Sequence, residues 1–171
     1  MLNRQIFLIG MPGCGKSSIG RKAARELGIT FLDLDEWIEE RAGMKVPEIF
    51  EQYGEEGFRR METGALTWLS RIPPCIISTG GGTPMTPVNR KIMKNFGSVI
   101  LLDRPEEQIL GDLRPENRPL LQESPEENFR RLYRERMPVY RQLADITVRN
   151  DGEYQQTVAL LMRALKDRYH A

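Results

Sequence analysis

Residues 10–17, with the sequence GMPGCGKS, fit the pattern G-x-x-x-x-G-K-[ST] without a mismatch. The segment follows an apolar run at residues 6–9 and precedes a helical apolar pattern, which is the context that this motif needs. Glycines let backbone N–H groups surround phosphate oxygens, and the start of a helix adds partial positive charge. Lys16 is expected to reach the β- and γ-phosphates, and the Ser17 hydroxyl is expected to bind Mg²⁺. A tight turn is the alternative, but a turn has no use for Lys16 and Ser17 together.

Cys14 lies inside the same loop, at a helix start, where the pKa of a thiol can be lowered. A reactive cysteine is one interpretation, and a small side chain that fills a variable position is the other. We favour the second interpretation because nucleophilic catalysis also needs a base. The single histidine, His170, lies one residue from the C-terminus.

Two acidic residues, Asp33 and Asp35, belong to a second candidate strand and its end. Alternate side chains of a strand share a face, so these two carboxylates are expected to lie on the same side. Ligands of open α/β sheets bind beyond the carboxyl ends of the strands. One acid could then support Mg²⁺, and the other could orient or deprotonate a substrate hydroxyl. Asp35 could instead be only the N-cap of a helix that begins at Glu36.

Two arginines are candidates for binding an anion. Arg59 is adjacent to Arg60 in a helical segment, so at most one of them is expected to face a cleft. A surface ion pair between Arg59 and Glu62 is the alternative. Arg136 lies on the apolar stripe of a later helix, where an unpaired cation is costly. A carboxylate or phosphate ligand suits the planar guanidinium, although an internal acid could also pair with it.

Three consecutive glycines, Gly80, Gly81 and Gly82, follow an apolar run at residues 75–77. They allow a very close approach of the backbone to another group, and a flexible turn is the alternative. Arg118 lies in an irregular stretch at about residues 111–124, whose length is typical of a functional lid. This arginine could close onto the phosphates and stabilise charge in the transition state, or it could be a solvated loop residue.

Alternating strands and helices must position these residues. Runs at residues 6–9, 75–77 and 99–102 are apolar on both faces, as expected of strands that helices cover on both sides. Shorter strands are expected at residues 31–34 and 145–148, with helical stripes in between. The pattern predicts a doubly wound α/β domain of about five parallel strands. One helix is expected to begin at Pro125, after the cap residue Ser124, and to end near Pro138.

Composition limits the classes of function. The 171 residues, 40% of them hydrophobic, fit a single soluble domain over residues 1–171. A net charge of +1 gives no basic field for nucleic-acid binding. Cys14 and Cys75 form no C-x-x-C pair, so neither a disulfide framework nor a zinc site is predicted. The first apolar run has four residues, too few for a signal peptide or a membrane span, so a cytoplasmic location is expected.

Six motifs in register, GMPGCGKS, LDLD, GFRRME, STGGG, NRPLL and RMPVYR, resemble the shikimate kinase family over nearly the entire chain. The resemblance implies a three-layer α/β/α P-loop kinase fold with a central five-stranded parallel sheet and a mobile lid. It implies transfer of the γ-phosphoryl of ATP to the 3-hydroxyl of shikimate, in chorismate and aromatic amino-acid biosynthesis. ATP is the expected co-substrate and Mg²⁺ the expected cofactor. A monomer is expected, without nucleic-acid, membrane or obligate protein partners, because no heptad or long apolar surface stripe is evident.

The resemblance also implies roles for individual residues. Asp33 supports the water shell of Mg²⁺, and Asp35 binds the hydroxyl that is phosphorylated. Arg59 and Arg136 bind the shikimate carboxylate, while the glycine triplet lines the substrate and the γ-phosphate. Catalysis is assigned to Lys16, Asp35 and Arg118, and the substrate-binding region to about residues 33–62. The nucleotide-binding set is Gly13, Cys14, Gly15, Lys16, Ser17, Ser18 and Arg118, with Ser17 and Asp33 at the metal.

The chain departs from the family around the adenine. Family members usually have a basic residue at the start of the lid and another after the last strand, where this chain has Leu110-Gly111-Asp112 and residues 150–153, NDGE. Arg114 or Arg149 could substitute. Two other functions stay open: a gluconate-type or other small-molecule kinase on the same fold, and a nucleotide-binding regulatory module that has lost the chemistry.

Overall fold

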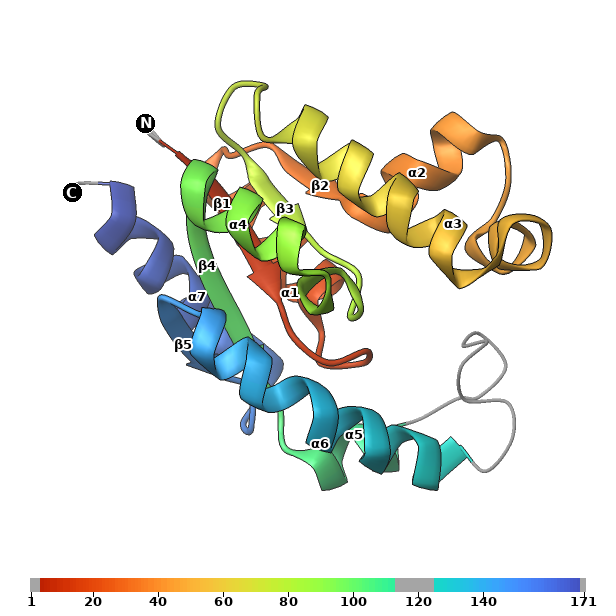
Figure 1. The fold of residues 1–171 in the computed structure, drawn as a ribbon. Helices are drawn as coiled ribbons and strands as arrows, with labels where there is room; N and C mark the ends of the chain where they lie inside the picture. Colours follow the sequence, from red (N-terminus) through yellow and green to blue (C-terminus); the bar gives the residue numbers. More distant parts are fainter. Residues whose placement is uncertain (1–3, 113–124, 170–171) are drawn as a thin grey trace.

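Five parallel strands form the central sheet in the order β2-β3-β1-β4-β5 (Figure 1). The computed structural model describes residues 4–112 and 125–169. The elements are β1 (Gln5–Ile9), α1 (Lys16–Leu27), β2 (Phe31–Asp33), α2 (Leu34–Ala42), α3 (Val46–Leu69), β3 (Ile76–Ser78), the 3₁₀ turn η1 (Thr83–Met85), α4 (Pro87–Phe96), β4 (Gly97–Asp103), α5 (Glu106–Gly111), α6 (Pro125–Leu143), β5 (Ile146–Arg149) and α7 (Tyr154–Tyr169). The predicted α/β class and the five parallel strands are confirmed.

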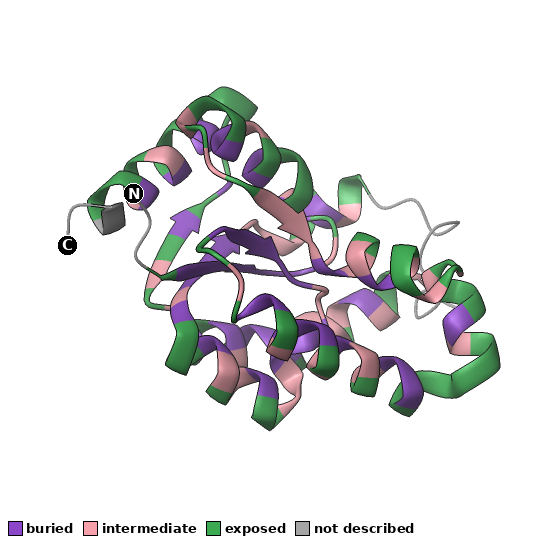
Figure 2. Ribbon diagram, turned by 90° about the horizontal axis from the view of Figure 1, so that it is seen from above, coloured by how far each residue is buried: buried purple, intermediate pink, exposed green. Residues whose placement is uncertain are grey.

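The core lies on both faces of the sheet. Every residue of β1 is buried, and the central part of β4 is buried as well. Figure 2 shows these strands between two layers of helices, where α1 packs against α7 on one face and α3 against α4 on the other. Burial from both sides explains why these strands are continuous apolar runs rather than alternating ones. Within the described residues, no helix is both long and apolar enough to cross a membrane.

Helix α6 contradicts one expectation, because it continues through Pro138 as far as Leu143. A proline inside a helix removes one backbone hydrogen bond. Pro138 is exposed, whereas Met137, Tyr140 and Leu143 are buried against the core. Packing of this apolar face therefore keeps the helix intact past the proline.

Candidate active site

The loop at residues 10–15 connects β1 to α1 and is shaped by its glycines. Gly10, Gly13 and Gly15 have φ angles of 153°, 82° and 93°, which other residues rarely adopt. Lys16 is buried, and its Nζ donates to the carbonyl oxygens of Gly10 at 2.8 Å and Met11 at 3.1 Å. The positive charge of Lys16 therefore lies inside the loop, where a loop of this type binds phosphate oxygens.

Cys14 is completely buried within this loop. A Cβ on Gly10 would lie 2.7 Å from the Cys14 Sγ, so the thiol already fills the space behind the loop. This packing supports the interpretation of Cys14 as a small filling side chain. The Ser18 hydroxyl, in the first turn of α1, donates to the Gly15 carbonyl at 3.2 Å.

Ser17 and Asp33 meet at the start of α1 and the end of β2. The Ser17 hydroxyl donates to Asp33 Oδ2 at 2.6 Å. The second oxygen of Asp33 accepts from the backbone N–H groups of Asp35, at 3.0 Å, and Glu36, at 3.4 Å. A hydroxyl and a carboxylate this close together suit Mg²⁺, which takes oxygen ligands from the protein directly or through water. Nucleotide phosphates and water supply its remaining ligands.

The expected geometry of the two aspartates is wrong in its detail. β2 ends at Asp33, which is the N-cap of α2, and Asp35 lies in the first turn of that helix. Asp35 is therefore neither a strand residue beside Asp33 nor the N-cap itself. The N-cap bond from Asp33 turns the chain at once, because its side chain satisfies two backbone donors at the helix start.

Asp35 points into the site as an unsatisfied acid. Its Oδ1 is buried and has no hydrogen-bond partner among the described residues. Burial, together with the negative charges of Asp33 and Glu62, raises the pKa of Asp35 to about 7, although Lys16 and Arg59 oppose the shift. A carboxyl that titrates near neutral pH and lacks a partner can accept a proton from a bound hydroxyl.

Arg59 is held in place by two acids of its own helix, α3. Its guanidinium contacts Glu62 at 2.6 Å and Glu55 at 3.1 Å. Glu62 is fully buried and also accepts a 2.5 Å hydrogen bond from the Thr83 hydroxyl. The ion pair considered as an alternative for Arg59 is thus present, but it directs the arginine into a pocket rather than onto the open surface.

Arg136 projects from α6 and is buried. Within the described residues no ion pair between Arg136 and an acid is found, and its side chain hydrogen-bonds with Tyr140 instead. One turn later on the same helix, the Tyr140 hydroxyl donates to the Gly81 carbonyl, and burial raises the pKa of Tyr140 to about 12. Tyr140 was not singled out from the sequence, although its spacing of four residues from Arg136 places both on one helix face.

The glycine triplet lies against these functional side chains, one glycine for each. A Cβ on Gly80 would lie 3.0 Å from Asp35 Oδ1, and one on Gly81 would lie 3.0 Å from Arg136 Nη1. A Cβ on Gly82 would collide with the guanidinium of Arg59. The close approach predicted for these glycines is therefore made to the site residues themselves, and the flexible-turn alternative does not explain it.

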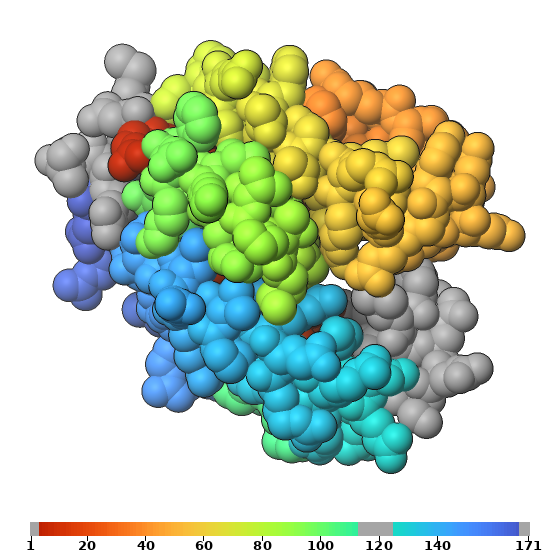
Figure 3. Space-filling view, in the orientation of Figure 1, coloured from red at the N-terminus to blue at the C-terminus, as the bar shows by residue number. Residues whose placement is uncertain are grey.

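Arg59, Gly82 and Arg136 border a common pocket of about 400 Å³. Figure 3 shows this face of the molecule, where α3 and α6 approach each other across η1. The remaining lining residues are Glu55, Met85, Arg131, Leu132 and Glu135. A pocket with converging guanidinium groups suits a small anion.

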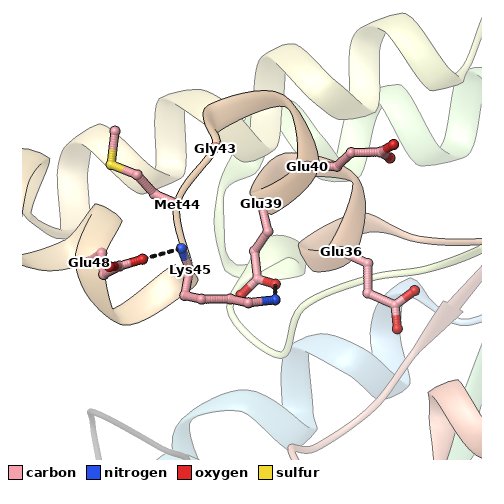
Figure 4. Close-up of a pocket in the computed structure, with 7 residues that line it drawn as sticks. All are labelled: Glu36, Glu39, Glu40, Gly43, Met44, Lys45 and Glu48. Atoms are coloured by element: carbon pink, nitrogen blue, oxygen red, sulfur yellow. Dashed lines mark hydrogen bonds and ion pairs between the residues drawn. The ribbon is translucent and has the colours of Figure 1, made fainter.

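A second hollow, of about 300 Å³, lies at the turn between α2 and α3. Figure 4 shows its acidic lining and the contacts of its single cation, Lys45. The Lys45 Nζ contacts Glu39 at 2.8 Å, and its backbone N–H donates to Glu48 at 2.6 Å. These bonds complete the helix turn, so this hollow is explained by local structure.

Of the two arginines considered for the adenine, Arg114 and Arg149, the structure describes only Arg149. Arg114 and Arg118 lie outside the described residues, as does most of the stretch at 111–124. Arg149 is exposed and pairs with Asp151 at 2.9 Å. Arg104, which directly follows β4, donates to the Gly13 carbonyl at 3.2 Å and was not predicted from the sequence.

The parallel sheet has a phosphate loop after its central strand, a buried acid at the start of α2, and a pocket bordered by two arginines. These features define a P-loop phosphotransferase for a small acidic acceptor. The family model for shikimate kinase matches residues 12–166. The chain belongs to the shikimate kinase family.

Shikimate kinases of other organisms match this chain over almost its full length. A shikimate kinase of Clostridium beijerinckii is 42% identical over 98% of this chain and 97% of its own. One of Neisseria meningitidis is 42% identical over 95% and 96%. Among solved structures, shikimate kinase from Acinetobacter baumannii in complex with shikimate has a TM-score of 0.88 and 38% identity. The match covers 96% of this chain and 94% of the Acinetobacter chain.

Proposed function

We propose that this chain transfers the γ-phosphoryl group of ATP to the 3-hydroxyl of shikimate, giving shikimate 3-phosphate and ADP. The observation that carries the proposal is Asp35, whose buried Oδ1 has no partner among the described residues. This oxygen lies against Gly80, two residues before Gly82, which borders the pocket together with Arg59 and Arg136. The two arginines bind the carboxylate of the acceptor, and this fixes which ring hydroxyl faces Asp35.

The reaction needs no covalent intermediate. Asp35 accepts the proton of the shikimate 3-hydroxyl while the oxygen of that hydroxyl bonds to the γ-phosphorus of ATP. The bond between the γ-phosphorus and the β–γ bridging oxygen breaks, and ADP leaves. Lys16 and the loop N–H groups of Gly13, Gly15, Ser17 and Ser18 surround the phosphates. Cys14 belongs to the same loop, but its own N–H donates to the Met11 carbonyl at 3.1 Å. Ser17 and Asp33 would hold Mg²⁺, which neutralises phosphate charge when bound.

The chain acts as a single-domain monomer in the cytoplasm. Arg118 lies outside the described residues, and its role stays a prediction.

The test compares acceptors. ADP release from MgATP is measured with shikimate and, in parallel, with gluconate, and the product is identified by phosphorus NMR. We expect release with shikimate alone and a phosphate on the 3-oxygen. Release with gluconate alone would assign a different acceptor, and ATP binding without release for either acid would leave a nucleotide-binding module.

A further inference from the structure

Asn150 connects the segment after β5 to the phosphate loop. Its Nδ2 donates to the Cys14 carbonyl at 2.8 Å, and its backbone N–H donates to the Asp103 carbonyl at the end of β4 at 2.7 Å. The side chain is buried behind the loop, where a Cβ on Gly15 would lie 3.3 Å from Nδ2. A residue more than 130 positions away thus supplies the partner of a loop carbonyl.

Thr157 of α7 and the Cys14 carbonyl together set the orientation of the Asn150 amide. The hydroxyl of Thr157, almost completely buried, donates to Asn150 Oδ1 at 2.8 Å. The Cys14 carbonyl can only accept, so it requires the amide nitrogen. The Thr157 hydroxyl, which also lies 3.4 Å from the Glu153 carbonyl, then donates to the amide oxygen on the other side. The opposite orientation would place the amide oxygen against the Cys14 carbonyl oxygen, with no donor between them.

The direction of the Cys14 carbonyl matters because of peptide geometry. In a planar trans peptide, the carbonyl of one residue and the N–H of the next point in opposite directions. Because the Cys14 carbonyl points toward Asn150, the Gly15 N–H points to the opposite side of the loop. That opposite side is where we propose that the phosphates bind. Gly13 and Gly15, on either side of Cys14, have φ angles of 82° and 93°, which leave this peptide few side-chain restraints of its own.

We propose that Asn150, oriented by Thr157, is a positioning residue that keeps the phosphate loop in its binding conformation without touching the nucleotide. The inference rests on the proposed nucleotide site. When the Asn150 bond is lost, the peptide between Cys14 and Gly15 samples other orientations. Phosphate then binds only to the fraction of molecules whose loop has the binding conformation. The apparent dissociation constant equals the intrinsic constant divided by that fraction.

Dissociation constants for MgADP and for magnesium pyrophosphate test the proposal, measured by calorimetry on wild type, Asn150→Ala, Thr157→Val and the double variant. Removing Asn150 is expected to raise both constants about tenfold, the effect of losing one buried hydrogen bond. Thr157→Val is expected to raise them about threefold, because the amide is then free to flip. The double variant is expected to bind no worse than Asn150→Ala, since both substitutions act through one bond.

Gln108→Ala is the matched control. The Gln108 amide also donates to a carbonyl of the same segment, that of Asp151 at 3.2 Å, but it is exposed and has no contact with the phosphate loop. Its constants are expected to equal those of wild type. The dissociation constant for shikimate alone is expected to stay unchanged in every variant, because neither Asn150 nor Thr157 lines the acceptor pocket.

A role in stability alone would lower the melting temperature and leave both phosphate constants of the folded protein unchanged, and that result would overturn the inference. Equal losses for the three single variants, the Gln108 control included, would overturn it as well. If Asn150→Ala does not fold, Thr157→Val, which replaces a hydroxyl by a methyl group, decides the question. Failure of the wild type to bind MgADP would instead contradict the proposed nucleotide site.

Discussion

The Ser17 hydroxyl lies 2.6 Å from Oδ2 of Asp33, although the two residues come from different elements. Their contact joins the first turn of α1 to the end of β2, and the N-cap bonds of Asp33 fix its carboxylate on the other side. Among the described residues there is no cluster of three or more His, Cys, Asp or Glu side chains that could hold a metal. A metal here depends on phosphate and water ligands in addition to the protein, as Mg²⁺ commonly does.

Asp33→Asn is expected to raise the Mg²⁺ concentration for half-maximal rate about tenfold, because one charge near the ion is lost. The measurement is a magnesium titration of ADP release at saturating ATP and shikimate. Glu36→Gln is the control, since Glu36 is exposed and pairs with Arg21 at 2.9 Å. Equal magnesium requirements for Asp33→Asn and wild type would contradict the assignment.

Arg59→Ala and Arg136→Ala are each expected to raise the KM for shikimate about 10- to 100-fold, the loss typical of a charge-assisted hydrogen bond. The KM for ATP should change less than about threefold, because neither arginine belongs to the phosphate loop. Arg60→Ala is the matched control: Arg60 is adjacent in sequence but exposed and paired with Glu56. An unchanged KM for shikimate in both variants would exclude the carboxylate-binding role.

Gly82→Ala should imitate the loss of Arg59. The added Cβ collides with the Arg59 guanidinium and has to displace it from the pocket. We expect the KM for shikimate to rise at least about tenfold while the melting temperature changes little. Gly64→Ala on α3, where a Cβ meets no atom within 4 Å, should leave the KM unchanged. A normal KM in Gly82→Ala would mean that Arg59 can move without consequence.

The raised pKa of Asp35 predicts a pH-dependent stability. Folding raises this pKa from 3.8 to about 7, so the folded state binds the proton more tightly than the unfolded state. The stability that this carboxyl contributes is fully present below about pH 4 and is lost as the pH rises to about 7, by at most about 4 kcal/mol. Asp35→Asn, which cannot ionise, should therefore gain in unfolding free energy relative to wild type across this interval.

Urea unfolding of both proteins from pH 4 to pH 8, with EDTA and without nucleotide, measures this difference. A difference that stays constant over that range would contradict the predicted shift. For catalysis the sign is the reverse, because a base has to be ionised: kcat/KM should rise with pH through about 7.

Much of the site was predictable because its parts are local in the sequence. The motif at residues 10–17 and the glycine triplet each follow an apolar strand, and parallel strands bring their carboxyl ends to one edge. Arg136 could be selected because a cation on an apolar helix stripe needs a partner. These inferences use periodicity and the cost of burying charge, which a single sequence contains.

Other features depend on contacts between distant segments. The bonds from Thr83 to Glu62 and from Asn150 to Cys14 join residues that no local pattern relates. The strand–helix boundary was misjudged, because N-capping by Asp33 ended the strand one residue before its expected end at residue 34 and placed Asp35 in the helix. Likewise, the helix continues past Pro138 because tertiary packing outweighs one missing hydrogen bond.

The most direct test of the proposed chemistry is the kcat of Asp35→Asn, determined together with its dissociation constant for shikimate. Asparagine keeps the size of the side chain but cannot accept the hydroxyl proton. We expect kcat to fall at least about 100-fold, within the range for removal of a general base, with shikimate binding changed less than about threefold. A kcat within about threefold of wild type, at unchanged binding, would contradict the assignment of Asp35 as the base.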